Sequence, residues 1–288
     1  MILTNEHGIP EEFVRAIQND AYDMGEADFS VTGLVQPPQI TRLREKHDDD
    51  ISIDVSDRIY MLLGTGVHNV LERVNRLLAE EQGMNSSNIA EERFFATHHS
   101  GTKISGAIDL LKGDGSMIDY KISTVYTARK PLKLDWEAQL NMYAWLLRQN
   151  DLEATKLTID LVCKDWSKGK AKREAGYPNS PIVSMSVPLW SEERQDRYVD
   201  SRVAIHTAEA TAPYTNEERW ARGGYKAVPG KGKSKKFDSL SEAATWINRH
   251  KTGGFTVLDE QPQFIRCESW CEVSDFCPQW KGEKGNAS

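Results

Sequence analysis

Two aspartates and one lysine form the strongest chemical signal in this sequence. Asp119 and Lys121 stand two residues apart in an apolar segment, and Asp109 lies in the apolar segment before it. A carboxylate among apolar residues is costly to bury unless it is paired or binds a metal. Oxygen ligands of this kind suit a hard divalent cation such as Mg²⁺ or Mn²⁺. Such a cation can polarise a phosphodiester oxygen and acidify a bound water, and a lysine can orient that water.

The elements that must position these side chains are predicted to be the two strands of a β-hairpin. Residues 103–111 and 117–122 have strand-like composition, and the short glycine-containing link between them is typical of a turn. Because side chains alternate between the faces of a strand, Asp119 and Lys121 project together, and Asp109 can meet them across the hairpin. Taken alone, an Asp-x-Lys pattern is more often an ordinary surface salt bridge.

The surrounding pattern of apolar residues predicts an α/β core. It indicates helices over residues 56–81, 134–147 and 191–210, and strands over residues 93–97, 103–111, 117–122, 157–163 and 182–187. We therefore expect three segments. They are an N-terminal extension over residues 1–55, a core over residues 56–210, and a C-terminal extension over residues 211–288 with a basic loop and a cysteine cluster.

Several short motifs accompany the hairpin residues in a fixed order along the chain. They are His68 in Gly64-Thr65-Gly66-Val67-His68, the acidic pair Glu91-Glu92, Ser105-Gly106-Ala107-Ile108-Asp109, Asp119-Tyr120-Lys121 and Gln139-Leu140-Asn141-Met142-Tyr143. The last three match the patterns G-x-(I/V)-D, (D/E)-x-K and Q-x-x-x-Y. In this order and spacing, the chain resembles the PD-(D/E)XK nuclease superfamily, specifically its RecB-like and Cas4-like branch.

The resemblance implies a fold and a metal site. The fold would be restriction-endonuclease-like, an α/β fold with a mixed central sheet flanked by helices and a cysteine-containing C-terminal tail. His68, Asp109 and Asp119 would be metal ligands, with Mg²⁺ or Mn²⁺ as the cation. Lys121 would position the nucleophilic water.

Three further residues are expected beside that centre. Gln139 and Tyr143 are one helical turn apart, so they share a helix face and would line the site against DNA or the lysine. Plain core packing stays an alternative for Tyr143. Of the acidic pair, we favour Glu91 over Glu92 as an additional acidic group, although strand alternation by itself does not decide which of them faces the site.

The resemblance also implies an activity, metal-dependent hydrolysis of DNA phosphodiesters, with an exonuclease favoured. The expected substrate is single- or double-stranded DNA with free ends, in processing or recombination, with a recombination protein as a natural partner. The motifs and size also suit a phage or mobile-element nuclease. Two alternatives stay open: a catalytically silent DNA-binding or assembly module, and a Cas4-like nuclease subunit of a larger complex. The intact Asp109, Asp119 and Lys121 argue against the silent module.

Two basic stretches are candidate DNA contacts. They carry Lys168, Lys170, Lys172 and Arg173 in one stretch and Lys231 and Lys233 in a glycine-rich loop. Trp166 and Tyr177 flank the first stretch, and lysines that track phosphates with occasional aromatic stacking are typical of a single-strand channel. Solvated loops are the alternative for both stretches. The pair His98-His99, near a turn, is expected to be simply exposed.

Three of the four cysteines crowd into the C-terminal segment, at Cys267, Cys271 and Cys277. Thiols this close commonly share a metal or cluster, and Cas4-like and AddB-like nucleases hold a [4Fe-4S] cluster with three such cysteines plus one upstream of the motifs. This sequence has no upstream cysteine. Cys163 is the remaining candidate for a fourth ligand, with a histidine or an exogenous ligand as alternatives. A [4Fe-4S] cluster, a Zn²⁺ ion and plain reduced thiols all stay open.

Length and composition exclude several classes of protein. The chain has 288 residues, 39% of them hydrophobic, which is enough for a sizeable core. The net charge of −7 argues against a simple basic coat for nucleic acid, but not against a local basic track. No apolar run approaches the ~20 residues of a membrane span, and the N-terminus lacks a secretory pattern. We therefore expect a cytoplasmic protein, in the host cytoplasm if phage-encoded, without a membrane partner.

Overall fold

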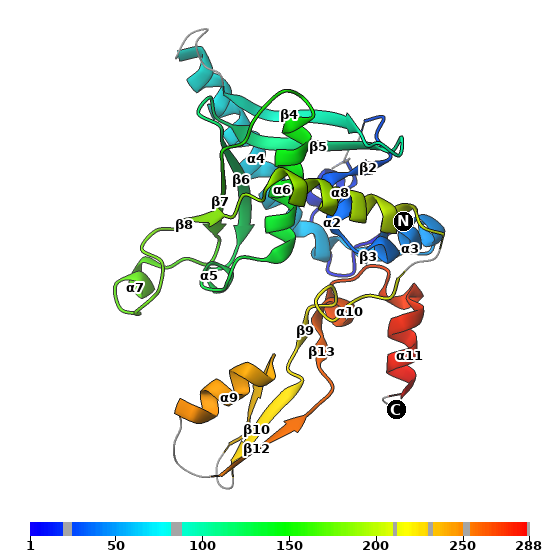
Figure 1. Ribbon diagram of the computed structural model, residues 1–288, viewed down its shortest axis with the longest axis vertical. Helices are drawn as coiled ribbons and strands as arrows, with labels where there is room; N and C mark the ends of the chain where they lie inside the picture. Colours follow the sequence, from blue (N-terminus) through cyan, green and yellow to red (C-terminus); the bar gives the residue numbers. More distant parts are fainter. Residues whose placement is uncertain (20–24, 82–87, 210–211, 230–232, 250–253, 287–288) are drawn as a thin grey trace. The chain divides into compact units, whose positions relative to one another are not determined.

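The computed structural model describes residues 1–19, 25–81, 88–209, 212–229, 233–249 and 254–286 (Figure 1). Contacts divide the chain into two compact units. The first, here called the sheet unit, comprises Leu3–Gln36 and Asp54–Ala208. The second, here called the cysteine unit, comprises Met1–Ile2, Pro37–Ile53 and Glu209–Ser288.

The sheet unit is built on a mixed six-stranded sheet. Its strand order is β2-β5-β6-β7-β8, with β4 paired to β5. The strands are β2 (Phe29–Ser30), β4 (Ile89–Thr97), β5 (Lys103–Leu111), β6 (Ser116–Ser123), β7 (Lys156–Cys163) and β8 (Ile182–Val187). The β2–β5 and β6–β7 pairs are parallel, whereas the β4–β5, β5–β6 and β7–β8 pairs are antiparallel. The predicted mixed central sheet flanked by helices is therefore confirmed.

Two long helices pack on this sheet (Figure 1). The helix predicted from Ser56 begins one residue earlier, as α4 (Val55–Glu81), and contacts β4 and β6. The second, α6 (Leu134–Arg148), contacts β4 and β5 and is itself covered by α2 (Val31–Val35) and α8 (Glu192–Thr207). Because α6 is enclosed on several sides, residues 140–147 are all buried. None of the described helices is both long and apolar enough to span a bilayer.

Residues before position 56 also take part in the sheet unit. β2 pairs with β5, and α1 (Glu11–Gln18) packs on α4. Part of the expected N-terminal extension thus contributes a strand to the central sheet. The division at residues 55 and 210 that the sequence suggests stays a prediction.

The cysteine unit contains two small cores. In the first, the antiparallel sheet β11-β10-β12 packs against α9 through Ala227, Phe237 and Ala243. The second core gathers Cys267, Cys277 and neighbouring apolar residues, with Cys271 partly buried against it. The remaining elements are β1 (Ile2–Thr4), α3 (Pro38–His47), β3 (Ser52–Asp54), α5 (Val125–Ala128), α7 (Lys168–Ala171), β9 (Ala221–Arg222), β10 (Tyr225–Pro229), β11 (Lys235–Phe237), α9 (Leu240–Arg249), β12 (Phe255–Asp259), β13 (Gln263–Phe264), α10 (Ile265–Ser269), η2 (Ser274–Phe276) and α11 (Pro278–Asn286).

Candidate active site

The candidate site lies where β5 and β6 stop pairing. The two strands pair next to their turn, at residues 110–111 of β5, whereas the start of β5 pairs with β2. Between these stretches, Asp109 Oδ2 accepts a hydrogen bond from the backbone N–H of Tyr120 at 2.6 Å. A carboxylate therefore takes the place of a backbone acceptor at the point where the ladder ends.

The carboxyl group of Asp109 is largely buried, with 11% of its side chain exposed. Burial and the negative charge of Asp119 raise the pKa of the Asp109 carboxyl to about 7. A negative charge on one buried carboxylate makes ionisation of the other harder. A perturbation of this kind is typical of functional sites.

Asp119 and Lys121 form a buried ion pair on β6. Lys121 Nζ lies 3.0 Å from Oδ1 and 2.9 Å from Oδ2 of Asp119, whose side chain is 5% exposed. Burial disfavours the ammonium, but the Asp119 carboxylate outweighs burial and raises the pKa of Lys121. Oδ2 of Asp119 is buried, and its closest cationic neighbour is the Lys121 ammonium, which makes its hydrogen bond to Oδ1. A cation bound at Oδ2 would add a further partner for this buried oxygen.

His68 reaches the same place from α4. Its Nδ1 lies 3.1 Å from Oε1 of Glu91 and 3.6 Å from Oδ1 of Asp109. The hydrogen bond with Glu91 and the charge of Asp109 raise the pKa of His68, although burial opposes the charged form. The imidazole therefore links α4 to two acidic groups on neighbouring strands.

Glu91 enters the site through an unusual backbone conformation. Its φ is +51°, a left-handed value that costs a residue other than glycine roughly 1–3 kcal/mol and often marks a functional position. The residues on either side of it pair with Leu110 and Ile108 of β5, which puts Glu91 opposite Asp109 in the register. Glu92 is exposed. The acidic residue favoured from the sequence is thus the one that contacts His68.

These donors fit a divalent cation. Ligand atoms of His68, Glu91 and Asp109 all lie within 4.8 Å of one another, and Asp119 has a buried oxygen without a hydrogen bond. Carboxylate oxygens with one imidazole suit Mg²⁺ or Mn²⁺. The sequence predicted His68, Asp109 and Asp119 as ligands, and the geometry adds Glu91. The position of the Glu91 side chain depends on the left-handed φ of that residue, which no sequence pattern reveals.

Gln139 and Tyr143 lie together on α6. Gln139 Nε2 donates a hydrogen bond to the Tyr143 hydroxyl at 3.0 Å. Tyr143 is buried and packs against Gly106 of β5, where a Cβ atom would lie only 2.7 Å from its ring. The ring therefore packs in the core, as the alternative reading expected, while its hydroxyl holds Gln139.

The first basic stretch forms an exposed turn after β7. The exposed cationic side chains are Lys168, Lys170, Lys172 and Arg173. Trp166 Nε1 donates a hydrogen bond to the Pro178 carbonyl at 2.8 Å, and the Tyr177 hydroxyl accepts one from the Ser167 N–H at 3.0 Å. Both aromatic side chains thus hold this segment in place, and their stacking on bases stays a prediction. In the second stretch, Lys233 is exposed, and Lys231 lies outside the described residues.

The pair His98-His99 differs from the expectation of simple exposure. His98 is buried, with Nε2 at 2.8 Å from Oδ1 of Asp200 on α8 and Nδ1 at 2.8 Å from Oγ of Ser100. His99 is exposed, as expected. Ligand atoms of the two histidines and Asp200 also lie within 4.8 Å of one another. The hydrogen bonds of His98 account for its burial as a link between the end of β4 and α8.

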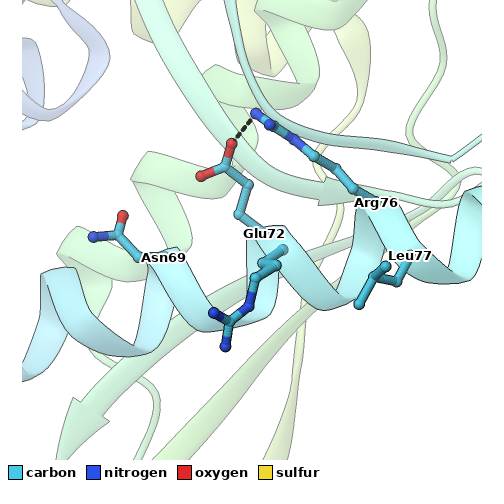
Figure 2. Close-up of a pocket in the computed structure, with 5 residues that line it drawn as sticks. Asn69, Glu72, Arg76 and Leu77 are labelled. Carbon is cyan, nitrogen blue, oxygen red and sulfur yellow. Dashed lines mark hydrogen bonds and ion pairs between the residues drawn. The ribbon is translucent and has the colours of Figure 1, made fainter.

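A shallow, open hollow lies along α4. It is lined by Asn69, Glu72, Arg73, Arg76 and Leu77. Figure 2 shows the ion pair between Glu72 and Arg76, one helical turn apart. None of the predicted site residues lines this hollow, and an exposed pair of this spacing is an ordinary feature of a helix surface.

All four cysteines are free thiols. Cys163 is buried in the core of the sheet unit, whereas Cys267, Cys271 and Cys277 belong to the second core of the cysteine unit. Burial, together with the neighbouring Cys271, raises the pKa of the Cys267 thiol to about 11. Among the described residues, the groups whose ligand atoms lie within 4.8 Å of one another do not include these three sulfurs.

Comparisons with known proteins identify the family of the chain. The family model described as "PD-(D/E)XK nuclease superfamily" matches residues 56–278, a span that contains all the predicted site residues. Among solved structures, the crystal structure of SSO0001 is similar to the chain at 19% sequence identity and a TM-score of 0.46. The match covers 72% of this chain and 89% of that one. No curated protein matches the chain significantly.

Proposed function

Because the chain belongs to the PD-(D/E)XK nuclease superfamily, we propose that it is a metal-dependent deoxyribonuclease with its active site at Asp109, Asp119 and Lys121. One observation carries this proposal. His68, Glu91 and Asp109 offer ligand atoms within 4.8 Å of one another, and burial together with the charge of Asp119, the partner of Lys121, raises the pKa of Asp109 to about 7. A divalent cation would add positive charge beside these acidic groups and favour their ionised forms.

Each residue would have a distinct role. Mg²⁺ or Mn²⁺ would polarise the scissile phosphate and acidify the attacking water. His68, Asp109 and Asp119 would hold the cation, with Glu91 as a further ligand. Asp109 would release its proton when positive charge arrives, because a nearby cation favours the carboxylate. Lys121, kept protonated by Asp119, would orient the water and offset charge developing on the phosphate.

Residues outside the metal centre would hold the DNA. Gln139, fixed by the hydroxyl of Tyr143, would present its amide to DNA or to Lys121. The backbone of the DNA would be contacted by Lys168, Lys170, Lys172, Arg173, Lys231 and Lys233. Contacts of lysine and arginine with phosphates supply most of the affinity for DNA and little sequence preference.

We further propose an exonuclease of the RecB-like and Cas4-like branch. It would act on free ends of single- or double-stranded DNA during processing or recombination, in the cytoplasm of a cell or of a phage host, together with a recombination protein. The motifs at His68 and at Gln139 to Tyr143 support this branch. A Cas4-like subunit of a larger complex is compatible with the same site. A silent DNA-binding module is disfavoured, because the acidic residues and Lys121 are all present.

The three C-terminal cysteines would hold a second centre with a structural role. The hydrolytic cation prefers oxygen ligands, so a thiolate centre would stabilise the cysteine unit rather than take part in hydrolysis. A [4Fe-4S] cluster and a Zn²⁺ ion are both compatible with thiolate ligands. Cys163 packs among apolar side chains in the other unit, which favours a fourth ligand that is not a cysteine.

Digestion of labelled DNA tests the proposed activity. Linear and closed circular DNA, single- and double-stranded, are incubated with the protein in Mg²⁺, Mn²⁺ or EDTA. We expect the linear forms to be degraded from their ends with either metal and to survive in EDTA. Cutting of closed circles would contradict the exonuclease, and intact DNA under all conditions would favour the silent module.

A further inference from the structure

We propose that Tyr214 belongs to the centre formed by Cys267, Cys271 and Cys277, where its hydroxyl donates a hydrogen bond to a metal-bound sulfur. This role rests on the proposed thiolate centre, and it is independent of hydrolysis at Asp119. Tyr214 would be a positioning residue of the centre rather than one of its ligands.

The hydroxyl of Tyr214 is a buried donor without an acceptor. The residue is only 7% exposed, and within the part of the chain that the structure describes its hydroxyl makes no hydrogen bond. A buried tyrosine hydroxyl usually has a partner, because leaving it unpaired costs its full desolvation. An orphan of this kind points to a ligand that completes the site.

The three cysteines belong to the same core as Tyr214. Tyr214 packs in the same core as Cys267 and Cys277, with Cys271 at its edge. After burial, these three cysteines are the groups that most raise the pKa of the Tyr214 hydroxyl. The hydroxyl therefore lies within electrostatic reach of all three sulfurs.

The backbone at Tyr214 is tied to the segment that carries the third thiol. Its N–H donates to Oε1 of Gln279 at 2.8 Å, and its carbonyl accepts from Nε2 of the same side chain at 3.1 Å. Gln279 follows Cys277 by two residues, in α11. This two-point attachment holds the tyrosine in position beside the cysteines.

Metal binding would change the sulfurs from poor acceptors to good ones. A neutral thiol is a weak hydrogen-bond acceptor. A thiolate bound to metal carries negative charge and accepts a stronger, charge-assisted hydrogen bond. The hydroxyl of Tyr214 is thus unsatisfied in the metal-free protein and satisfied in the loaded one, so its removal should affect the two states in opposite directions.

The variant Tyr214→Phe tests this role, because it keeps the ring and removes only the hydroxyl. Full-length protein is purified without oxygen and reconstituted with iron and sulfide. Iron content, the rate of iron release to a chelator, and the melting temperature of stripped protein are then measured. We expect full iron content, release about tenfold faster than from the wild type, and a stripped variant that melts no lower than stripped wild type.

Tyr177→Phe is the matched control, since the hydroxyl of Tyr177 accepts a hydrogen bond from Ser167 in the sheet unit. It should lower the melting temperature of the protein and leave iron release unchanged. Release at the wild-type rate from Tyr214→Phe would overturn the proposal. Loss of iron as complete as in Cys271→Ser would also overturn it, because Tyr214 would then be a ligand. Wild-type protein that binds no iron would overturn the centre itself, while DNA cleavage by the same preparation would leave the nuclease proposal standing.

Discussion

The raised pKa of Asp109 makes the stability of the folded protein depend on pH. In the metal-free protein the pKa of Asp109 rises from 3.8 to about 7. The folded protein therefore binds the proton more tightly than the unfolded chain, so the stability contributed by Asp109 is present at about pH 4 and is lost as the pH rises towards 7. The asparagine of Asp109→Asn has no carboxyl group and stays neutral over this pH range. In urea denaturation with EDTA, we predict that the variant gains stability over the wild type between pH 5 and pH 8. If the free energies of unfolding of the two proteins change with pH in parallel, the raised pKa of Asp109 is contradicted.

Gln139 and Tyr143 are predicted to act together at the site. Gln139→Ala should lower the cleavage rate by about tenfold, as the loss of a group beside the metal ligands commonly does, with little change in melting temperature. Tyr143→Phe keeps the ring against Gly106 and removes only the acceptor of the Gln139 hydrogen bond. It should therefore show a smaller loss of the same kind. If both variants cleave DNA at the wild-type rate, the two residues only pack the core.

At the residue scale, the identity of the site residues was easier to predict from the sequence than their contacts. The placement of Asp119 and Lys121 on one face of the hairpin, with Asp109 across from them, was predicted from strand alternation, which is a local rule. The choice of Glu91 over Glu92 depends on a left-handed backbone angle at Glu91, and that angle is imposed by tertiary packing. The indole N–H of Trp166 donates a hydrogen bond to the backbone carbonyl of Pro178. Only a folded chain reveals that partner.

Among the elements, the contact between β5 and α6 explains the glycine before Asp109. A Cβ atom at Gly106 would lie 2.7 Å from the ring of Tyr143, so Gly106→Ala should push α6 away from the sheet. We predict a destabilisation of about 1–3 kcal/mol in a urea titration, together with reduced cleavage. Gly66→Ala on α4 is the matched control, because no atom lies within 4 Å of the added methyl group.

The control should be neutral or more stable by up to roughly 1 kcal/mol, since alanine is the better helix former. Equal effects of the two alanines on stability would show that the close approach of α6 to Gly106 is not important.

The long helices and the hairpin were predictable from their apolar periods. The two-residue strand β2 was not, because a pair of residues carries no period and its pairing with β5 is set by tertiary contacts.

On the scale of the whole molecule, the net charge of −7 has to be reconciled with a polyanionic substrate. We expect the turn after β7 to provide a local positive track, because four exposed cations gather there. Replacing Lys168, Lys170 and Lys172 by glutamine should weaken DNA binding. It should also reduce the slope of log Kd against log salt by up to about 3, if each lysine contacts one phosphate.

Lys156→Gln is the control for the lysine track, since Lys156 lies at the opposite end of β7 from this turn. Its salt slope should remain that of the wild type, and so should its affinity. A triple variant with an unchanged slope would place the DNA elsewhere on the protein. Binding would then depend on other cations, such as those near Lys233.

The central claim, hydrolysis at a metal held by Asp109 and Asp119, is tested most directly by single-turnover cleavage of end-labelled DNA by Asp119→Asn in Mg²⁺. The amide keeps the shape of the side chain and removes the charge that binds the cation. We predict that cleavage falls by at least about a thousandfold while DNA binding persists, and that Asp114→Asn in the hairpin turn cleaves normally. Cleavage by Asp119→Asn within tenfold of the wild-type rate would contradict the proposed site.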